Sequence, residues 1–282
     1  FCITSSVLLR AYLPTAMAVW APAATVLAYY LASGAWHMTQ LEIIVAFPLL
    51  VCATFAVRSL SPGGLRRGDL LIGGVAGGII LVFKIALLPV LMGIWLVLLG
   101  RAIQHRLPLS EIAIGALVVA VATLVPVGVT LAIGYAQGVG DLMWTTFFVL
   151  PPQVLAETPG APLSRLLAGI RWFLMSFAAF AGLAVLGVFR IRDERYGAFV
   201  ATALAWGIGA GVAIVMQRTS WWTYHFLLLL PPTVLLAAFG ISAISLKNTI
   251  GVSPAARFAL ISLATLVAAA PLSVAAVSAA SN

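Results

Sequence analysis

Long apolar runs separated by short polar segments dominate this chain and limit what it can fold into. Several runs approach the roughly 20 residues that a helix needs to cross about 30 Å of hydrocarbon. Only 8% of the 282 residues are charged and 63% are hydrophobic, whereas soluble domains carry about 25% charged residues. The alternating segments of a membrane β-barrel are absent. The sequence therefore predicts an all-α, polytopic transmembrane helical bundle.

About nine stretches are predicted to cross the membrane. They are 13–32, 41–57, 70–83, 86–100, 111–134, 166–189, 196–216, 226–246 and 258–279. The third and fourth could instead form one long helix from Leu70 to Leu99, with Lys84 at its centre. The chain is expected to form a single transmembrane domain over residues 1–282.

Loop charge decides between a hairpin at Lys84 and one long helix. With a hairpin, eleven basic residues share the cytoplasmic side and four lie outside, whereas a long helix gives seven on each side and strands Lys84 in the bilayer. The positive-inside rule and the cost of a buried charge favour the hairpin. The inner set is Arg10, Arg58, Arg66, Arg67, Arg101, Arg106, Arg190, Arg192, Arg195, Lys247 and Arg257, and the outer set is Lys84, Arg165, Arg171 and Arg218.

The net charge of +8 is explained by these inner loops, so no nucleic-acid partner is expected. Cys2 and Cys52 offer neither a disulfide framework nor metal-ligand spacing. The large outer loop over 135–165 contains the aromatic stretch "DLMWTTFFVL", which begins at Asp141 and is expected to form a helix in the membrane interface. Because the chain begins with Phe1, we expect that part of its N-terminus is missing.

Polar groups gather at the expected outer surface, where orientation rules do not call for cations. Arginine and lysine there suit a lipid phosphate. Aromatic residues such as Trp221 and Trp222 suit either an interfacial belt or stacking on a sugar. The candidate substrate-binding residues are Lys84, Gln217, Arg218, Tyr224, His225, Gln40 and Glu42.

A divalent cation is a further possibility at this surface. His37 and His225 could join Glu42 as ligands, since imidazole and carboxylate both bind divalent ions. A histidine inside the membrane is more often part of hydrogen-bonded structure, so no metal ligands are assigned.

Three segments resemble, in order and spacing, those of the GT-C type glycosyltransferases. They are "HMTQLEIIVAFPLLVCATFAVR", "GDLLIGGVAGGIILVFKIALLPVLMGIWLVLL" and "MQRTSWWTYHFLLLLPPTVLLAAFG". The last is similar to a helix entry in bacterial members related to family 39 and to the Rgt-like sugar transferases. Together the segments extend from Trp36 to Gly240.

The resemblance implies a multi-pass enzyme of the bacterial plasma membrane. Such an enzyme moves a sugar from a polyprenyl-phosphate donor to a lipid or glycan acceptor on the outer face. Lys84 and Arg218 would hold the phosphate, and Gln217, Tyr224 and His225 would line the pocket. The family's catalytic acid follows its first helix, so here it is expected in the missing N-terminal portion.

Two other functions use the same features. A transporter or flippase of lipid-linked or amphipathic substrates would share the spans and the cationic outer surface, but would be expected to carry acids for ion coupling at the centres of its spans. A structural subunit of an envelope complex would use the polar clusters as contact surface. The span centres carry almost no acids, and this favours the transferase.

Labelling with an impermeant thiol reagent tests the predicted sidedness. In a background without the native thiols, His37→Cys, Lys84→Cys, Gln153→Cys and Trp221→Cys should react from outside the cell, and Asp193→Cys should not. Labelling at position 193 but not at 221 would overturn the hairpin at Lys84.

Overall fold

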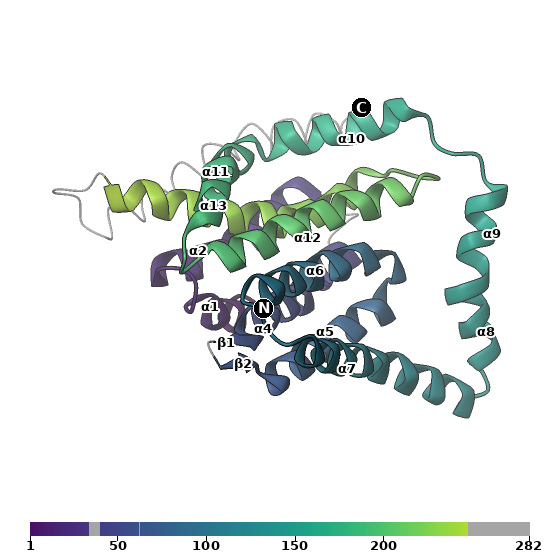
Figure 1. The fold of residues 1–282 in the computed structure, drawn as a ribbon. Helices are drawn as coiled ribbons and strands as arrows, with labels where there is room; N and C mark the ends of the chain where they lie inside the picture. Colours follow the sequence, from purple (N-terminus) through teal and green to yellow (C-terminus); the bar gives the residue numbers. More distant parts are fainter. Residues whose placement is uncertain (34–39, 62, 248–282) are drawn as a thin grey trace. The chain divides into compact units, whose positions relative to one another are not determined.

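The computed structural model describes residues 1–33, 40–61 and 63–247, and these are almost entirely helical (Figure 1). The all-α prediction is confirmed. The chain divides into two compact units. Unit 1 takes Phe1–Ile44, Leu167–Gly207 and the chain from Thr223 onward, and unit 2 takes Val45–Leu166 and Ile208–Trp222. The single domain expected over 1–282 stays a prediction.

Unit 1 is built on helices from both ends of the sequence. Its elements are α1 (Cys2–Leu9), α2 (Thr15–Ser33), α3 (Leu41–Ile44), α10 (Leu163–Ser176, from Leu167), α11 (Ala178–Val188), η4 (Phe189–Arg192), the first half of α12 (Gly197–Met216), η5 (Thr223–Leu229) and α13 (Leu230–Lys247). Helix α13 packs against both α2 and α11. It forms the centre of the unit.

Helices α12 and α13 run antiparallel within unit 1. The rings of Phe199 and Phe239 lie 6.0 Å apart, and further along α12 a methyl group at Gly207 would lie 4.0 Å from Pro232. Residue numbers therefore rise on one helix as they fall on the other. Tyr12 stacks on Phe199 with ring centres 4.4 Å apart, so the α1–α2 turn lies at the end of the unit where α12 begins.

Two glycines allow α11 to cross α13 closely (Figure 1). A methyl group at Gly187 would lie 3.2 Å from the Gly240 nitrogen and would collide with the Leu236 carbonyl oxygen. A methyl group at Gly240 would lie 3.2 Å from the Gly187 nitrogen and would collide with the Leu183 oxygen. Small residues let helix backbones meet in lipid, where packing replaces the hydrophobic effect.

Unit 2 consists of four long helices, a minimal hairpin and an outer strap. Its elements are α4 (Ala46–Ser59), β1 (Leu60–Ser61), β2 (Gly64–Leu65), α5 (Arg67–Phe83), η2 (Ile85–Leu87), α6 (Leu88–Gln104), α7 (Leu109–Ala136), α8 (Gly140–Trp144), the π-helical η3 (Thr145–Val149), α9 (Leu150–Glu157) and the end of α12. Figure 1 shows α8 and α9 turning away from the axis of α7. We call the segment from the start of α8 to Ala161 the strap, and it follows α7 directly.

The glycines of α5 face two different neighbours. Towards α6, a methyl group at Gly73 would lie 2.9 Å from the Trp95 ring, and one at Gly77 would lie 3.7 Å from Leu91. Because 73 pairs with 95 and 77 with 91, α5 and α6 are antiparallel. The helical structure is interrupted between them at Lys84, which has an extended backbone with φ −160°. The hairpin at Lys84 is confirmed, and a continuous helix from 70 to 99 is excluded.

Towards α7, the other two glycines of α5 set a parallel register. A methyl group at Gly74 would lie 2.6 Å from Ala122, and one at Gly78 would lie 2.8 Å from Pro126. The Thr123 hydroxyl donates a hydrogen bond of 3.1 Å to the Gly74 carbonyl oxygen. Since α5 and α7 are parallel, Lys84 and the start of the strap lie at the same end of unit 2.

Six helices of the described residues are long and apolar enough to cross a membrane, so the chain is a multi-pass membrane protein. They cover Thr15–Ala32, Leu41–Ser59, Ile85–Gln104, Leu109–Ala136, Gly197–Met216 and Thr223–Ser242. Helix α5 is present over the expected 70–83 span, but it has only 17 residues. The ninth expected span, 258–279, lies outside the described residues.

The span expected over 166–189 is broken into two helices rather than continuous. Helices α10 and α11 meet at an angle of 84°, and the break is at Phe177, whose φ and ψ are −124° and 26°. The Phe177 ring is buried and lies 5.0 Å from the Phe173 ring and 6.0 Å from the Trp172 ring, centre to centre. Ring packing, with no proline, stabilises this bend.

Each unit, described by itself, gathers most of its arginines at one end, and the exceptions are Arg171 of unit 1 and Arg165 and Arg218 of unit 2. In unit 2 the antiparallel α5 and α6 bring Arg66 and Arg67 to the same end as Arg101 and Arg106. In unit 1, Arg190, Arg192 and Arg195 join Arg10 at the end where α12 begins. This segregation agrees with the inner side assigned from loop charge.

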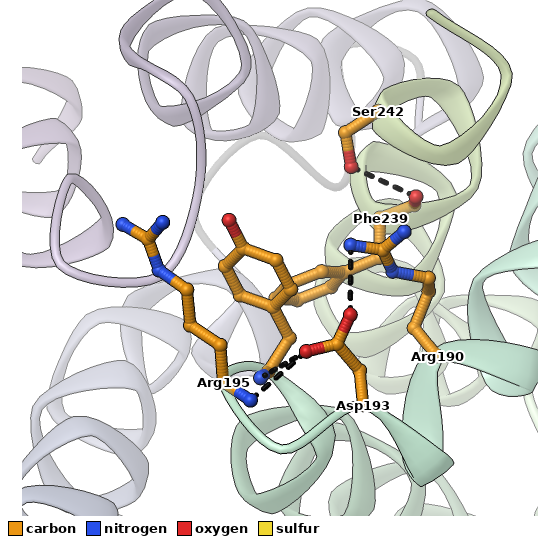
Figure 2. Close-up of polar contacts among 6 residues, drawn as sticks. Arg190, Asp193, Arg195, Phe239 and Ser242 are labelled. Atoms are coloured by element: carbon orange, nitrogen blue, oxygen red, sulfur yellow. Dashed lines mark hydrogen bonds and ion pairs between the residues drawn. The ribbon is translucent and has the colours of Figure 1, made fainter. Parts of the chain in front are cut away.

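Asp193 organises the arginine-rich turn of unit 1 (Figure 2). Its carboxylate lies 3.0 Å from the Arg190 guanidinium and accepts a 2.9 Å hydrogen bond from the Arg195 backbone N–H. The guanidinium groups of Arg190 and Arg195 lie 5.1 and 5.2 Å from the centre of the Tyr196 ring. The turn before α12 is therefore held by charge and cation–π contacts.

A glycine substitution tests the α11–α13 crossing. Gly187→Ala should lower the free energy of unfolding by about 1–3 kcal/mol, because the new methyl group must displace the α13 backbone. Gly182→Ala on the same helix has open space around its methyl group and should leave stability unchanged or slightly raised. Reversible unfolding in mixed micelles measures both. Equal stability of the two variants would show that the crossing tolerates a side chain.

Candidate functional site

The structure distributes the seven expected site residues between the two units. Gln40, Glu42, Tyr224 and His225 belong to unit 1, and Lys84, Gln217 and Arg218 belong to unit 2. Each group is described within its own unit.

The unit 1 group surrounds a buried carboxylate. Glu42 stands in the first turn of α3, and only 3% of its surface is exposed. Helix α3 packs against η5, which carries Tyr224 and His225. A buried carboxylate is expensive unless polar groups surround it, so this packing places the acid where hydrogen-bonding side chains are near.

Two aromatic residues and a second tyrosine complete this polar cluster. The Tyr224 and His225 rings meet edge to face, with centres 4.4 Å apart, and His225 is buried. The hydroxyl of the fully buried Tyr29 accepts a 3.2 Å hydrogen bond from the Gln40 backbone N–H. We define Tyr29, Gln40, Glu42, Tyr224 and His225 as the Glu42 cluster. It lies at the end of unit 1 opposite the arginines, because α12 and α13 are antiparallel.

The Glu42 cluster offers groups for acid–base and hydroxyl recognition. A carboxylate, an imidazole and two phenols can accept or donate protons and hydrogen bonds. Ionisable residues inside a membrane protein are functional candidates because hydrocarbon disfavours them. Within the described residues no three His, Cys, Asp or Glu side chains are arranged to hold a metal. His37 lies outside the described residues, so a divalent cation stays a prediction.

Lys84 lies at the break between α5 and α6. Its N–H donates to the Ile80 carbonyl oxygen over 2.9 Å, and its own carbonyl oxygen accepts from the Leu87 N–H over 3.0 Å. The residue is half-buried. Both backbone polar groups of Lys84 therefore have hydrogen-bond partners in the adjoining helices. The residue lies at the end of unit 2 where the strap starts.

Arg218 fastens the strap, a role that the sequence did not reveal. Its guanidinium donates a 2.6 Å hydrogen bond to the Leu155 carbonyl oxygen in α9. Its own carbonyl oxygen accepts a 2.7 Å hydrogen bond from the Ala161 N–H. The two bonds connect Arg218 to backbone groups that lie roughly sixty positions earlier in the chain. No pattern of side-chain types in the sequence could predict them. We call the pair of bonds the Arg218 clasp.

The residues around Arg218 also close the end of α12. The Gln217 side chain donates to the Ala213 carbonyl oxygen over 3.0 Å, and the Trp221 indole donates to that of Ile214 over 3.0 Å. Trp221 has a φ of +43°, a conformation uncommon for a bulky residue. The Gln217 amide and the Trp221 indole thus satisfy free carbonyl groups at a helix C-terminus.

The second tryptophan of the pair remains on the surface. Trp222 is 53% exposed, and the Arg165 guanidinium lies 5.5 Å from the centre of its ring. Such a pair suits the membrane interface, where one face is apolar and the other meets charge.

No protein-family model, no curated protein and no solved structure matches this chain.

Removing the Arg218 side chain should loosen the strap. In Arg218→Ala the amide of Ala161 keeps its acceptor, but the bond to Leu155 is lost. A solvent-exposed charged hydrogen bond contributes at most about 1 kcal/mol, so exchange at the Ala161 amide should become up to about five-fold faster. Hydrogen exchange with mass spectrometry over 158–163 measures this change.

Arg165→Ala is the matched control for the clasp. It removes a neighbouring cation that contacts Trp222 rather than the strap carbonyl, and exchange at Ala161 should stay at the wild-type rate. Unchanged exchange in Arg218→Ala would mean that the strap is held without the guanidinium.

Proposed function

We propose that this chain belongs to an integral-membrane glycosyltransferase of GT-C-like architecture with about nine spans. It moves a sugar from a polyprenyl-phosphate donor to a lipid or glycan acceptor on the outer face of a bacterial plasma membrane. The observation that carries the proposal is the burial of Glu42 beside Tyr224 and His225 at the end of unit 1 opposite its arginines. The charge segregation of each unit supports an outward position for this end.

The chemistry requires a hydroxyl to be held and a phosphate to be stabilised. The acceptor oxygen forms a bond to the anomeric carbon and gives its proton to a carboxylate, while the bond from that carbon to the phosphate oxygen breaks. The leaving phosphate carries the negative charge that a cation must offset. In this proposal the Glu42 cluster binds sugar or acceptor hydroxyl groups, and Lys84 attracts the phosphate.

We assign Arg218 and Gln217 a smaller part in substrate binding than their residue types alone indicated. One Nη atom of Arg218 is engaged by Leu155, and the Gln217 amide is engaged by Ala213. We propose that Arg218 contributes mainly by holding the strap, with its remaining guanidinium donors available to a phosphate.

A transporter or flippase is the second candidate, and one observation favours it. The 84° bend between α10 and α11 interrupts an apolar stretch, and broken helices recur at the substrate sites of transporters. Transfer of labelled sugar and translocation of labelled lipid, assayed in the same proteoliposomes, separate the two functions. Translocation without transfer would support the transporter and exclude the enzyme.

Glu42→Gln in the full-length protein tests the enzyme directly. The amide keeps the size of the side chain but removes its charge. A hydrogen bond to a charged group contributes about 1.5–3 kcal/mol, so sugar transfer should fall roughly 10- to 150-fold. Transfer of radiolabelled sugar from the polyprenyl-phosphate donor in washed membranes is the measurement.

Glu157→Gln is the control for this substitution. Glu157 ends α9 on the surface, so its variant should transfer sugar at the wild-type rate. If Glu42→Gln matches Glu157→Gln in transfer and in expression, Glu42 has no part in substrate binding.

A further inference from the structure

An apolar groove runs along α6 in unit 2, between α6 and α7, with α5 as its floor. It has a volume of about 350 Å³. Its length extends from Leu88 to Ala102 on α6, which at 1.5 Å per helical residue is roughly 21 Å. Ala116 and Ala120 line it from α7. The groove is therefore long and narrow, and it follows the direction of the membrane-spanning helices.

The glycines of α5 explain why this groove exists. Gly74 and Gly78 let the α7 backbone approach α5, whereas α6 reaches Gly73 and Gly77 through the side chains of Trp95 and Leu91. Helix α6 therefore stays farther from α5 than α7 does, and a wedge of space is left between α6 and α7. The small side chains of α7 that face this wedge do not fill it.

The apolar side chains that line the groove favour a hydrocarbon ligand. Apart from Thr123, its side chains carry no oxygen and only the Trp95 indole carries nitrogen. The Thr123 hydroxyl already donates to the Gly74 carbonyl oxygen. A polar ligand would lose its hydration in this groove without compensation.

The groove opens sideways, towards the space that lipid occupies. Met92 and Leu96 line it and are also 54% and 58% exposed. Both belong to a helix long and apolar enough to span the membrane. Hydrocarbon chains of the bilayer can therefore enter laterally.

Cations stand at one end of the groove. At this end the last α6 residue that lines the groove is Ala102, and Arg101 is the residue before it. The α6–α7 turn adds the exposed Arg106, and the connection before α5 adds the exposed Arg66. None of these three arginines forms a salt bridge with another residue that the structure describes. Glu111 shares this end, where its carboxylate accepts a 2.6 Å hydrogen bond from the Leu65 N–H. The three arginines outnumber this acid, so charge complementarity places an anionic group at the Ala102 end.

We propose that this groove binds an anionic phospholipid of the bilayer. One acyl chain lies between α6 and α7, and the phosphate meets Arg101, Arg106 and Arg66. An acyl chain that enters from this end crosses one leaflet, roughly 15 Å deep, within the length of the groove. The basic end lies on the predicted cytoplasmic side, where anionic lipids attract arginine. This lipid is a partner distinct from the sugar donor.

Filling the groove tests the position of the acyl chain. Ala120→Phe places a ring in the space, and Ala116→Leu does so more mildly in case the larger residue disturbs folding. Leu117→Phe on the exposed side of the same helix is the control, since Leu117 does not line the groove. The full chain is purified from membranes, and retained phosphatidylglycerol is counted by native mass spectrometry.

We expect wild type and Leu117→Phe to retain phosphatidylglycerol, and we expect retention to fall at least five-fold in Ala120→Phe, with a smaller fall in Ala116→Leu. Unchanged retention in both filled variants would overturn the proposal. A wild-type dimer that Ala120→Phe dissociates would overturn it too, because a second copy of the chain would then occupy the groove.

Neutralising the cations tests the headgroup. Adding phosphatidylglycerol should raise the melting temperature of wild type more than adding phosphatidylcholine. The double variant Arg101→Gln with Arg106→Gln should lose this preference, while Arg192→Gln, at the basic end of unit 1, should keep it. Equal stabilisation by both lipids in wild type would overturn the assignment of an anionic headgroup.

Discussion

Close backbone approach at glycine is the interaction on which the arrangement of these helices depends. In lipid there is no hydrophobic force between helices, so van der Waals contact must hold them together. Gly187 and Gly240 supply it in unit 1, and Gly74 and Gly78 of α5 supply it against α7 in unit 2. The two faces of α5 also set the directions of α6 and α7. The sidedness of Lys84 and the open groove both follow from this one glycine-rich helix.

Polar residues divide into those that build the structure and those that remain for function. Arg218, Gln217 and Trp221 donate to backbone carbonyl oxygens near the strap and the end of α12. Carbonyl groups in the last turn of a helix need such partners because they have no acceptor role within the helix. Glu42, in contrast, is a carboxylate buried at the start of a span, where α3 packs against the η5 segment that carries Tyr224 and His225. The distinction makes the Glu42 cluster the better candidate for substrate binding.

Much of the fold could be predicted from hydropathy and charge, and the reasons are physical. The break at Lys84 was predictable because a lysine at mid-bilayer is costly and because loop arginines have a preferred side. The bend at Phe177 was not, since aromatic residues pack there without proline or glycine. The Arg218 clasp also escaped prediction, because its partners are backbone groups and any residue type can supply them. Glu42 was identifiable by type, but its burial with Tyr224 depends on tertiary packing.

The length of α7 has a consequence for the kind of bilayer that this protein fits. Its 28 residues extend roughly 42 Å, which exceeds a hydrocarbon core of about 30 Å but equals a bilayer of 40–45 Å with its headgroup layers. Matching the core alone would need a tilt of roughly 45°, beyond the usual range. An upright α7 instead carries the first residue of α8 to headgroup level. In a thinner membrane α7 would have to tilt to reduce the hydrophobic mismatch, and this tilt would displace the strap attached to its end. The position of the strap therefore depends on bilayer thickness.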